Sequence, residues 1–114
     1  MLRFFLSLVL VASGCRPAAV TLPTSEAQGC PARPPSYRAD VEPVLRGKCF
    51  ACHAGNGDAV DEIDLSKFET VHAGRVALEG KVRARAMPPA GRPELTDSER
   101  QMLLSWLACQ APEN

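Results

Sequence analysis

The chain is poor in large aromatic residues and carries no net charge. Its 114 residues include one Trp, one Tyr and four Phe, and its 13 Lys and Arg residues balance 13 Asp and Glu residues. Without an excess of positive charge, the composition gives no indication of nucleic-acid binding or of broad attraction to a membrane surface. So few aromatic residues also leave little material for a large hydrophobic core.

The N-terminal apolar run is too short to cross a membrane. It covers residues 4–12, follows a short head that ends in Arg3, and falls well below the roughly 20 apolar residues that a membrane span needs. A short apolar run at this position predicts an export signal, which we assign to residues 1–14.

Small residues precede Cys15 at the end of this predicted signal. The sequence Ala12-Ser13-Gly14-Cys15 resembles the lipobox of bacterial lipoproteins. The resemblance implies cleavage before Cys15, a diacylglycerol on its thiol, and a periplasmic protein that is anchored to a membrane rather than spanning it. Ala12 departs from the leucine that is usual in the lipobox, so ordinary cleavage after Ser13 stays open as the alternative.

The segment after the signal is rich in proline. Residues 15–36 hold five prolines among small and polar residues, which predicts a partly extended tether. The predicted domain, residues 37–110, has about 75 residues, a length that rarely builds a sufficient core without a covalent link or a bound group. Residues 111–114 would form a short tail.

A Cys-x-x-Cys-His motif is the feature around which the domain is organised. If this segment is helical, Cys49 and Cys52 share a face, so both thiols can bond to the two vinyl groups of one porphyrin. His53 follows directly and can bind the iron through an imidazole nitrogen. The spacing is that of a c-type haem attachment sequence, and it predicts one covalently bound haem c. The haem would also supply the apolar body that the core lacks.

Three other interpretations compete with haem. A structural zinc site needs four ligands, and no second Cys-x-x-Cys or His-x-x-x-His pair follows in the sequence. A thioredoxin-like redox pair needs alternating strands and helices, which the sequence does not suggest. Chance occurrence of a five-residue pattern is the third alternative.

Met87 is the candidate for the second axial ligand of the iron. A thioether is a soft ligand suited to haem iron, and paired with His it raises the reduction potential. Pro88 and Pro89 follow it, so the sulfur would sit on a stiff turn. Met102 is a poor rival because it lies within a predicted helix, and His72 is a rival because haems with two His ligands exist.

The remaining cysteines are Cys30 and Cys109. Export places the chain in a compartment that permits disulfides, so we expect these two residues to be bridged. The bridge would join the start of the domain to its last helix and add about 2 to 4 kcal/mol of stability. Two separate thiols are the alternative.

Capping signals and apolar spacing predict the helices of the domain. Asp40 is the expected cap of a first helix, with Pro43 in its first turn and the haem-binding motif at its C-terminal end. A capping box over residues 66–69 predicts a short helix over 67–73 that ends at Gly74.

The last helix has the clearest signal. Residues 96–99 form a second capping box, and the following apolar residues recur on one stripe with Trp106 in the core. For residues 76–86 the pattern leaves a short helix and an extended segment both open.

Taken together, these pieces resemble a small class I cytochrome c of the exported bacterial type. The resemblance rests on Asp40 to Leu45 leading into the Cys49–His53 motif, then Met87-Pro88-Pro89, then a helix ending in Leu104-Ser105-Trp106-Leu107. It implies an all-α fold of three to four short helices around one covalent haem, with His53 as proximal and Met87 as distal ligand. Many relatives carry a proline soon after the haem-binding histidine, and this chain does not, so the partner that orients His53 is not identified.

The resemblance implies a one-electron carrier, and not an enzyme, tethered at the periplasmic side of a membrane. A gas-binding or gas-sensing haem protein, in which Met87 leaves the iron, is the alternative function; haem peroxidase catalysis would need a distal acid and base that the sequence does not offer. Cationic residues near Met87 would either meet an acidic surface on a redox partner or form a solvated surface that also neutralises haem propionates. These residues are Arg75, Lys81, Arg83, Arg85 and Arg92, opposed only by Glu79.

Overall fold

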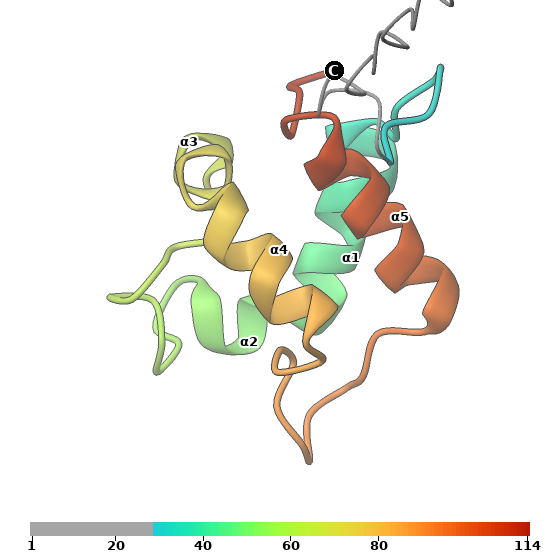
Figure 1. Ribbon diagram of the computed structural model, residues 1–114. Coiled ribbons are helices and arrows are strands. Elements are labelled where there is room, and N and C mark those ends of the chain that lie inside the picture. The colour runs from blue at the N-terminus through green and yellow to red at the C-terminus, as the bar shows by residue number, and fades with distance from the viewer. Residues whose placement is uncertain (1–28) are drawn as a thin grey trace, which may run out of the picture.

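The computed structural model describes residues 29–114, and helices are the regular secondary structure of this part of the chain (Figure 1). The all-α class predicted from the sequence is therefore confirmed. The elements are a π-helical turn η2 (Tyr37–Val41), α1 (Glu42–Lys48), α2 (Phe50–His53), α3 (Phe68–Ala73), α4 (Arg75–Arg83) and α5 (Asp97–Ala108). This divides the helices more finely than the expected three to four.

Ser36, and not Asp40, caps the first helical segment. The Ser36 hydroxyl accepts from Ala39 N at 3.3 Å, while the Asp40 carboxylate reaches back and accepts from Ser36 N at 2.8 Å. The Ser36 carbonyl accepts from Val41 N at 3.1 Å, which is the wider spacing of a π-helix. The predicted cap at Asp40 is wrong because its carboxylate bonds to a backbone N–H before it in the chain rather than after it. Pro43 lies in the first turn of α1, as predicted.

The helix that carries the Cys-x-x-Cys-His motif is interrupted at the first cysteine. Cys49 has φ −120° and ψ −36°, which ends α1, and its carbonyl then accepts from His53 N at 3.0 Å as α2 begins. The interruption turns α2 relative to α1, as Figure 1 shows. The motif therefore begins at Cys49, between α1 and α2, and its histidine is the last residue of α2.

The core takes buried residues from η2, α1, α3, α4 and α5. Trp106 is fully buried, its indole N–H donates to Pro112 O at 3.0 Å, and its ring centroid lies 5.6 Å from that of Tyr37. Such aromatic pairs contribute about 0.5 to 1.5 kcal/mol beyond the area they bury. The predicted core position of Trp106 is confirmed, and the contact between the first and last helical segments passes through η2. The other buried residues are Val41, Leu45, Leu65, Val71, Val82, Leu95, Leu103, Leu107 and Ala111.

The predicted capping box over residues 66–69 does not form. α3 begins at Phe68, its N-cap residue is Lys67, and no side chain caps it. The N–H of Ser66 donates instead to the Asp64 carboxylate at 3.0 Å, and this competing turn places Ser66 one residue too early to cap the helix. The predicted end of the helix at Gly74 is correct, and α4 follows at once, which settles residues 76–83 as helical.

The capping box at the start of α5 forms as predicted. Thr96 N donates to the Glu99 carboxylate at 2.7 Å, and Glu99 N donates to the Thr96 hydroxyl at 3.1 Å. The first of these bonds, ahead of a smaller contribution from Lys48, holds the pKa of Glu99 below its usual value. α5 thus has a fixed starting point directly after the loop that carries Met87.

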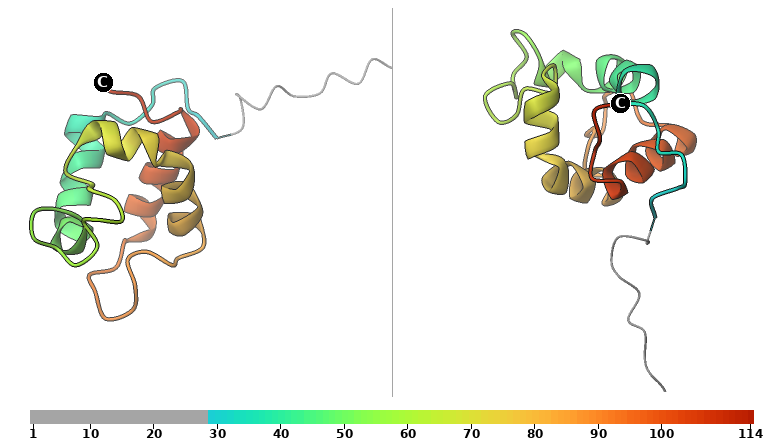
Figure 2. Two further views of the ribbon diagram at one scale, coloured as in Figure 1. Left: turned by 90° about the vertical axis from the view of Figure 1, so that its left-hand side faces the viewer. Right: turned by 90° about the horizontal axis from the view of Figure 1, so that it is seen from above.

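The first and the last segments of the described chain lie at the same end of the domain (Figure 2). Cys30 and Cys109, the predicted pair, lie at disulfide distance with their Cα atoms 4.8 Å apart. The Ser36 hydroxyl donates to Asn114 O at 2.8 Å, and Tyr37 N donates to the Asn114 side chain at 3.0 Å. The last residues assigned to the tether and the residues assigned to the tail therefore lie against the domain. The predicted signal, Cys15 and the rest of the tether lie outside the described residues.

Within residues 29–114, no helix combines the length and the apolar character that crossing a bilayer requires.

Candidate functional site

A cavity of about 650 Å³ brings together the four residues predicted to hold the haem. Cys49, Cys52 and His53 line it from the α1–α2 junction and α2, and Met87 lines it from the loop between α4 and α5. These positions are far apart in the sequence, and the fold makes them neighbours of one space. The volume falls in the range of about 300 to 1,000 Å³ that is usual for cofactor sites.

The lining of the cavity fits a flat, mostly apolar group with acidic edge substituents. The charged residues at its border are three cations and two acids, Lys48, Lys81, Arg92, Asp58 and Glu62. Most of the wall is aliphatic, from Leu45, Ile63, Leu65, Leu78, Val82, Leu95 and Leu103. Apolar walls suit the faces of a porphyrin, and cations at the border suit its carboxylates. The residues present therefore fit the haem that the motif predicts.

The imidazole of His53 is oriented by a backbone carbonyl. Its Nδ1 atom lies 3.3 Å from Ile63 O. A carbonyl oxygen can only accept, so Nδ1 carries the hydrogen and Nε2 keeps its lone pair free for a metal. This is the orienting partner that the sequence did not identify, and it comes from a residue ten positions after the histidine.

The loop that supplies this carbonyl is bonded to α2 along its length. Ala59 N donates to Cys52 O at 2.9 Å, and Leu65 N donates to His53 O at 2.8 Å. Gly57 packs directly on Cys52, because a Cβ atom added to Gly57 would lie 2.8 Å from Cys52 Cα and closer still to the Cys52 carbonyl. Only glycine permits this approach of one backbone to another.

Cys49 and Cys52 are both free thiols in this structure. Burial raises the pKa of the Cys49 thiol to about 11, so this sulfur is protonated at neutral pH. A reactive redox cysteine needs a lowered pKa, and the described chain has no strands for a thioredoxin-like sheet. Among residues 29–114, no group of three or more His, Cys, Asp or Glu side chains gathers in a way that could bind a metal ion, so the zinc interpretation gains no support.

Met87 is placed by the way α4 ends. Ala86 N donates to Lys81 O at 3.0 Å and Arg85 N to Val82 O at 3.2 Å, which together form a Schellman motif. Its left-handed position is occupied by Arg85, with φ +56°, rather than by glycine. The motif reverses the chain at the helix end, and Met87 follows two residues later, half-buried at the cavity.

Comparison of this chain with protein-family models, with curated proteins and with solved structures finds no match.

The two rival ligands lie elsewhere. His72 does not line the cavity; its Nδ1 atom lies 3.0 Å from Ala111 O, so this side chain joins α3 to the C-terminal residues. Met102 packs against the hydrophobic core from α5 and also does not line the cavity. Of the candidates considered, Met87 alone shares the cavity with His53.

The cationic residues near Met87 divide into two groups. Arg83 pairs with Glu79, Arg85 pairs with Asp97 at 3.1 Å, and Arg75 donates to His72 O at 3.0 Å. Lys81 and Arg92 border the cavity and have no ion-pair partner in the described part of the chain.

Sequence reasoning missed three contributors to this site. Lys48 borders the cavity beside Cys49 and donates to Glu94 O at 2.9 Å, which joins α1 to the Met87 loop. Its position next to the motif could have drawn attention to it. Gly57 could have been noted as one of two glycines in the loop after His53. Ile63 contributes a backbone oxygen, for which a sequence carries no signal.

Proposed function

We propose that this protein is a one-electron carrier that holds one haem c in the cavity bordered by Cys49, Cys52, His53 and Met87. The observation that carries the proposal is the meeting of these four residues in one apolar space of suitable volume. On this proposal the helical arrangement is a cytochrome c-like fold, and the protein is an electron-transfer protein rather than an enzyme.

Each residue has a distinct part in holding the cofactor. Cys49 and Cys52 would attach it through two thioether bonds, and His53 Nε2 would bind its iron while Nδ1 donates to Ile63 O. The Met87 sulfur would be the second protein ligand of the iron. Haem held in this way supplies an iron that alternates between Fe(II) and Fe(III).

The protein keeps this centre dry and fixed. The aliphatic wall excludes water, and the hydrogen bond from His53 to Ile63 O limits rotation of the imidazole. The Schellman turn and the two prolines fix the position of Met87. A centre whose ligands do not move when the charge changes favours electron transfer over ligand exchange, which supports the carrier over the gas-binding alternative.

The redox partner would meet the border of the cavity. Lys81 and Arg92 have no ion-pair partner in the described part of the chain and form a cationic edge at the cavity, whereas Lys48 is paired with Glu99 at 3.6 Å. We expect an acidic docking surface on the partner, because complementary charges speed association. The rate of electron transfer to such a partner should fall steeply as salt is added, since surface charges are screened within about 10 Å at 0.1 M salt. A rate that does not change with salt would argue against this edge.

Export and a lipid on Cys15 would place the carrier at the periplasmic face of a membrane. The lipid would anchor the protein without a membrane-spanning segment.

The proposal is tested by expressing the full chain together with haem-maturation machinery and measuring the mass and the absorption spectrum of the mature product. We expect the added mass of one haem, the lipid on Cys15, and loss of two hydrogens at Cys30 and Cys109. The oxidised protein should show the far-red band expected of Met sulfur bound to haem iron. A colourless protein that is nevertheless compact would overturn the proposal.

Two variants separate the carrier from the gas-binding alternative. Met87→Ala should keep the covalent haem, lose the far-red band and bind carbon monoxide in the reduced state. Met102→Ala is the matched control, and it should keep the band and exclude carbon monoxide. Ready carbon monoxide binding by the unmodified reduced protein would favour the gas-binding function instead.

A further inference from the structure

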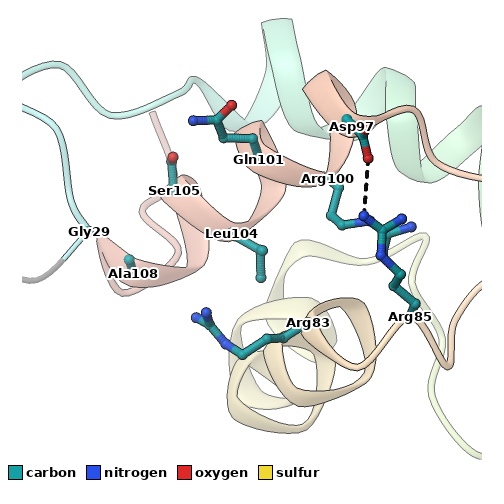
Figure 3. Close-up of a pocket in the computed structure, with 9 residues that line it drawn as sticks. All are labelled: Gly29, Arg83, Arg85, Asp97, Arg100, Gln101, Leu104, Ser105 and Ala108. Carbon is teal, nitrogen blue, oxygen red and sulfur yellow. Dashed lines mark hydrogen bonds and ion pairs between the residues drawn. The ribbon is translucent and has the colours of Figure 1, made fainter.

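A second cavity, of about 460 Å³, lies between the end of α4 and the outer side of α5 (Figure 3). It shares no lining residue with the cavity that holds His53 and Met87. Three arginines line it, Arg83, Arg85 and Arg100, and Asp97 is the one acidic residue among its lining. The lining therefore carries an excess of positive charge.

Arg100 has a donor that the protein does not use. Its Nη1 atom donates to Val82 O at 2.7 Å, which fixes the guanidinium against the end of α4. Its Nε atom is buried and has no hydrogen-bond partner among the described residues. Because Nε is covered by protein atoms, an anion in the cavity would reach Arg100 through the N–H groups of its Nη atoms.

Arg85 occupies a backbone position that suits glycine. Its φ of +56° places an arginine at the left-handed residue of the Schellman motif. The Arg85 side chain lines the cavity and forms an ion pair with Asp97, whose side chain is 89 % exposed. An ion pair so open to water contributes little to stability, so this pair does not explain why an arginine stands here.

The existing ion pairs leave the arginines able to bind another anion. Arg83 and its partner Glu79 are 63 % and 32 % exposed, so this pair is also well solvated. A guanidinium has five N–H donors in a forked arrangement and can serve a side-chain carboxylate and a second acceptor together.

We propose that this cavity binds a small oxyanion with more than one negative charge. Arginine forks match the geometry of carboxylate and phosphate oxygens. Gln101 and Ser105 add neutral hydrogen-bonding groups to the lining, and Leu104 and Ala108 add an apolar portion. In Figure 3 the side chains of Arg83 and Leu104 project into the space between α4 and α5, so charged and apolar contacts face the same volume. The site does not depend on haem.

The test is a calorimetric titration of the full mature chain, with inorganic phosphate in one series and succinate in the other, at constant ionic strength. We expect saturable binding at one site for at least one of the two probes. Stronger binding of succinate would assign the site to an organic acid, and stronger binding of phosphate would assign it to a phosphate group. Absence of saturable binding of both probes overturns the proposal.

The variant Arg83→Gln with Arg85→Gln should weaken binding by about tenfold or more, because it removes two of the three cations that line the cavity. The matched control is Arg46→Gln on α1, which also removes an exposed arginine paired with a glutamate four residues away. The control should bind as the unmodified chain does. Equal weakening in both would show that general charge attracts the anion, and would overturn the site.

A measurement without substitutions guards against a misfolded variant. Chemical shifts of ¹⁵N-labelled unmodified protein should move saturably in residues 83–85 and 97–105 as the probe is added. Shifts that centre on another part of the molecule would overturn the assignment to this cavity.

Discussion

The two sides of the larger cavity are held in different ways. The His53 wall, residues 53–65, is bonded to α2 by Ala59 N to Cys52 O and by Leu65 N to His53 O, and Gly57 packs directly on the α2 backbone. The Met87 wall, residues 84–95, is fixed where α4 ends and where α5 begins. Between those points its backbone makes one turn, from Arg92 N to Pro89 O at 3.2 Å, and accepts a bond from the Lys48 side chain. We infer that the His53 wall is the more rigid side, and that in the Met87 wall the segment after Met87 is less constrained than Met87 itself, which lies next to the fixed end of α4.

The largest effect is expected from Gly57→Ala in the His53 wall. The added Cβ would meet the backbone of Cys52, which cannot move without shifting α2, so we expect a loss of about 2 to 3 kcal/mol in the free energy of unfolding. Chemical denaturation measures this loss. Gly80→Ala in α4 is the control, because its Cβ would meet nothing within 4 Å, and it should stabilise the protein by about 0.5 to 1 kcal/mol.

A smaller loss is expected from Gly91→Ala in the Met87 wall. Gly91 has φ +84° but no atom near the position of an added Cβ, so only the left-handed backbone is penalised, by about 1 kcal/mol. The same denaturation experiment gives the value. A loss equal to that of Gly57→Ala would mean that the two walls are equally constrained, and the comparison would fail.

A gain in stability is expected from Arg85→Gly at the start of the Met87 wall. Glycine takes the left-handed conformation without strain, so the free energy of unfolding should rise by about 0.5 to 1 kcal/mol. Arg85→Ala removes the same side chain but keeps the strained backbone, and it should show no such gain. If both variants behave alike, backbone conformation is not what limits this turn.

The smallest effect is a pH dependence in the His53 wall. Hydrogen bonds from Ser66, followed by those from Lys67, lower the pKa of Asp64 to about 2 from its usual 3.8. Because the folded-state pKa is the lower one, this contribution to stability is present above about pH 4 and is lost as the pH falls toward 2. The melting temperature of Asp64→Asn should therefore fall less between pH 5 and pH 2 than that of the unmodified protein. These two pH values roughly bracket the folded and unfolded pKa values. Asp61→Asn, which changes an exposed carboxylate nearby, should follow the unmodified protein.

Local signals in the sequence predicted what is decided locally. The Thr96–Glu99 capping box formed because both of its hydrogen bonds lie within four residues. The box over residues 66–69 failed because Asp64 takes the N–H of Ser66. In the same way, the Asp40 carboxylate, which we predicted to cap the first helix, accepts instead from the backbone N–H of Ser36.

Features that depend on the whole fold could not be predicted in the same way. The α4 segment shows one buried residue, Val82, so it carries too weak a periodicity to distinguish a helix from an extended chain. Every residue has a backbone carbonyl, so the amino-acid sequence could not single out Ile63 as the hydrogen-bond partner of His53. For the site, the motif and Met87 pointed to side chains that do meet at one cavity, whereas their supporting contacts needed the three-dimensional arrangement.

The chain enters the domain at the end opposite to the Met87 loop. Ser36 and Tyr37 meet Asn114 at one end of the molecule, and Figure 1 places the Met87 loop at the other end. The 14 peptide links from Cys15 to Gly29 can span at most about 50 Å when fully extended. If Cys15 carries the proposed lipid, these residues would keep the domain within about 50 Å of the bilayer surface, with the Met87 loop on the side that faces away from the attachment point.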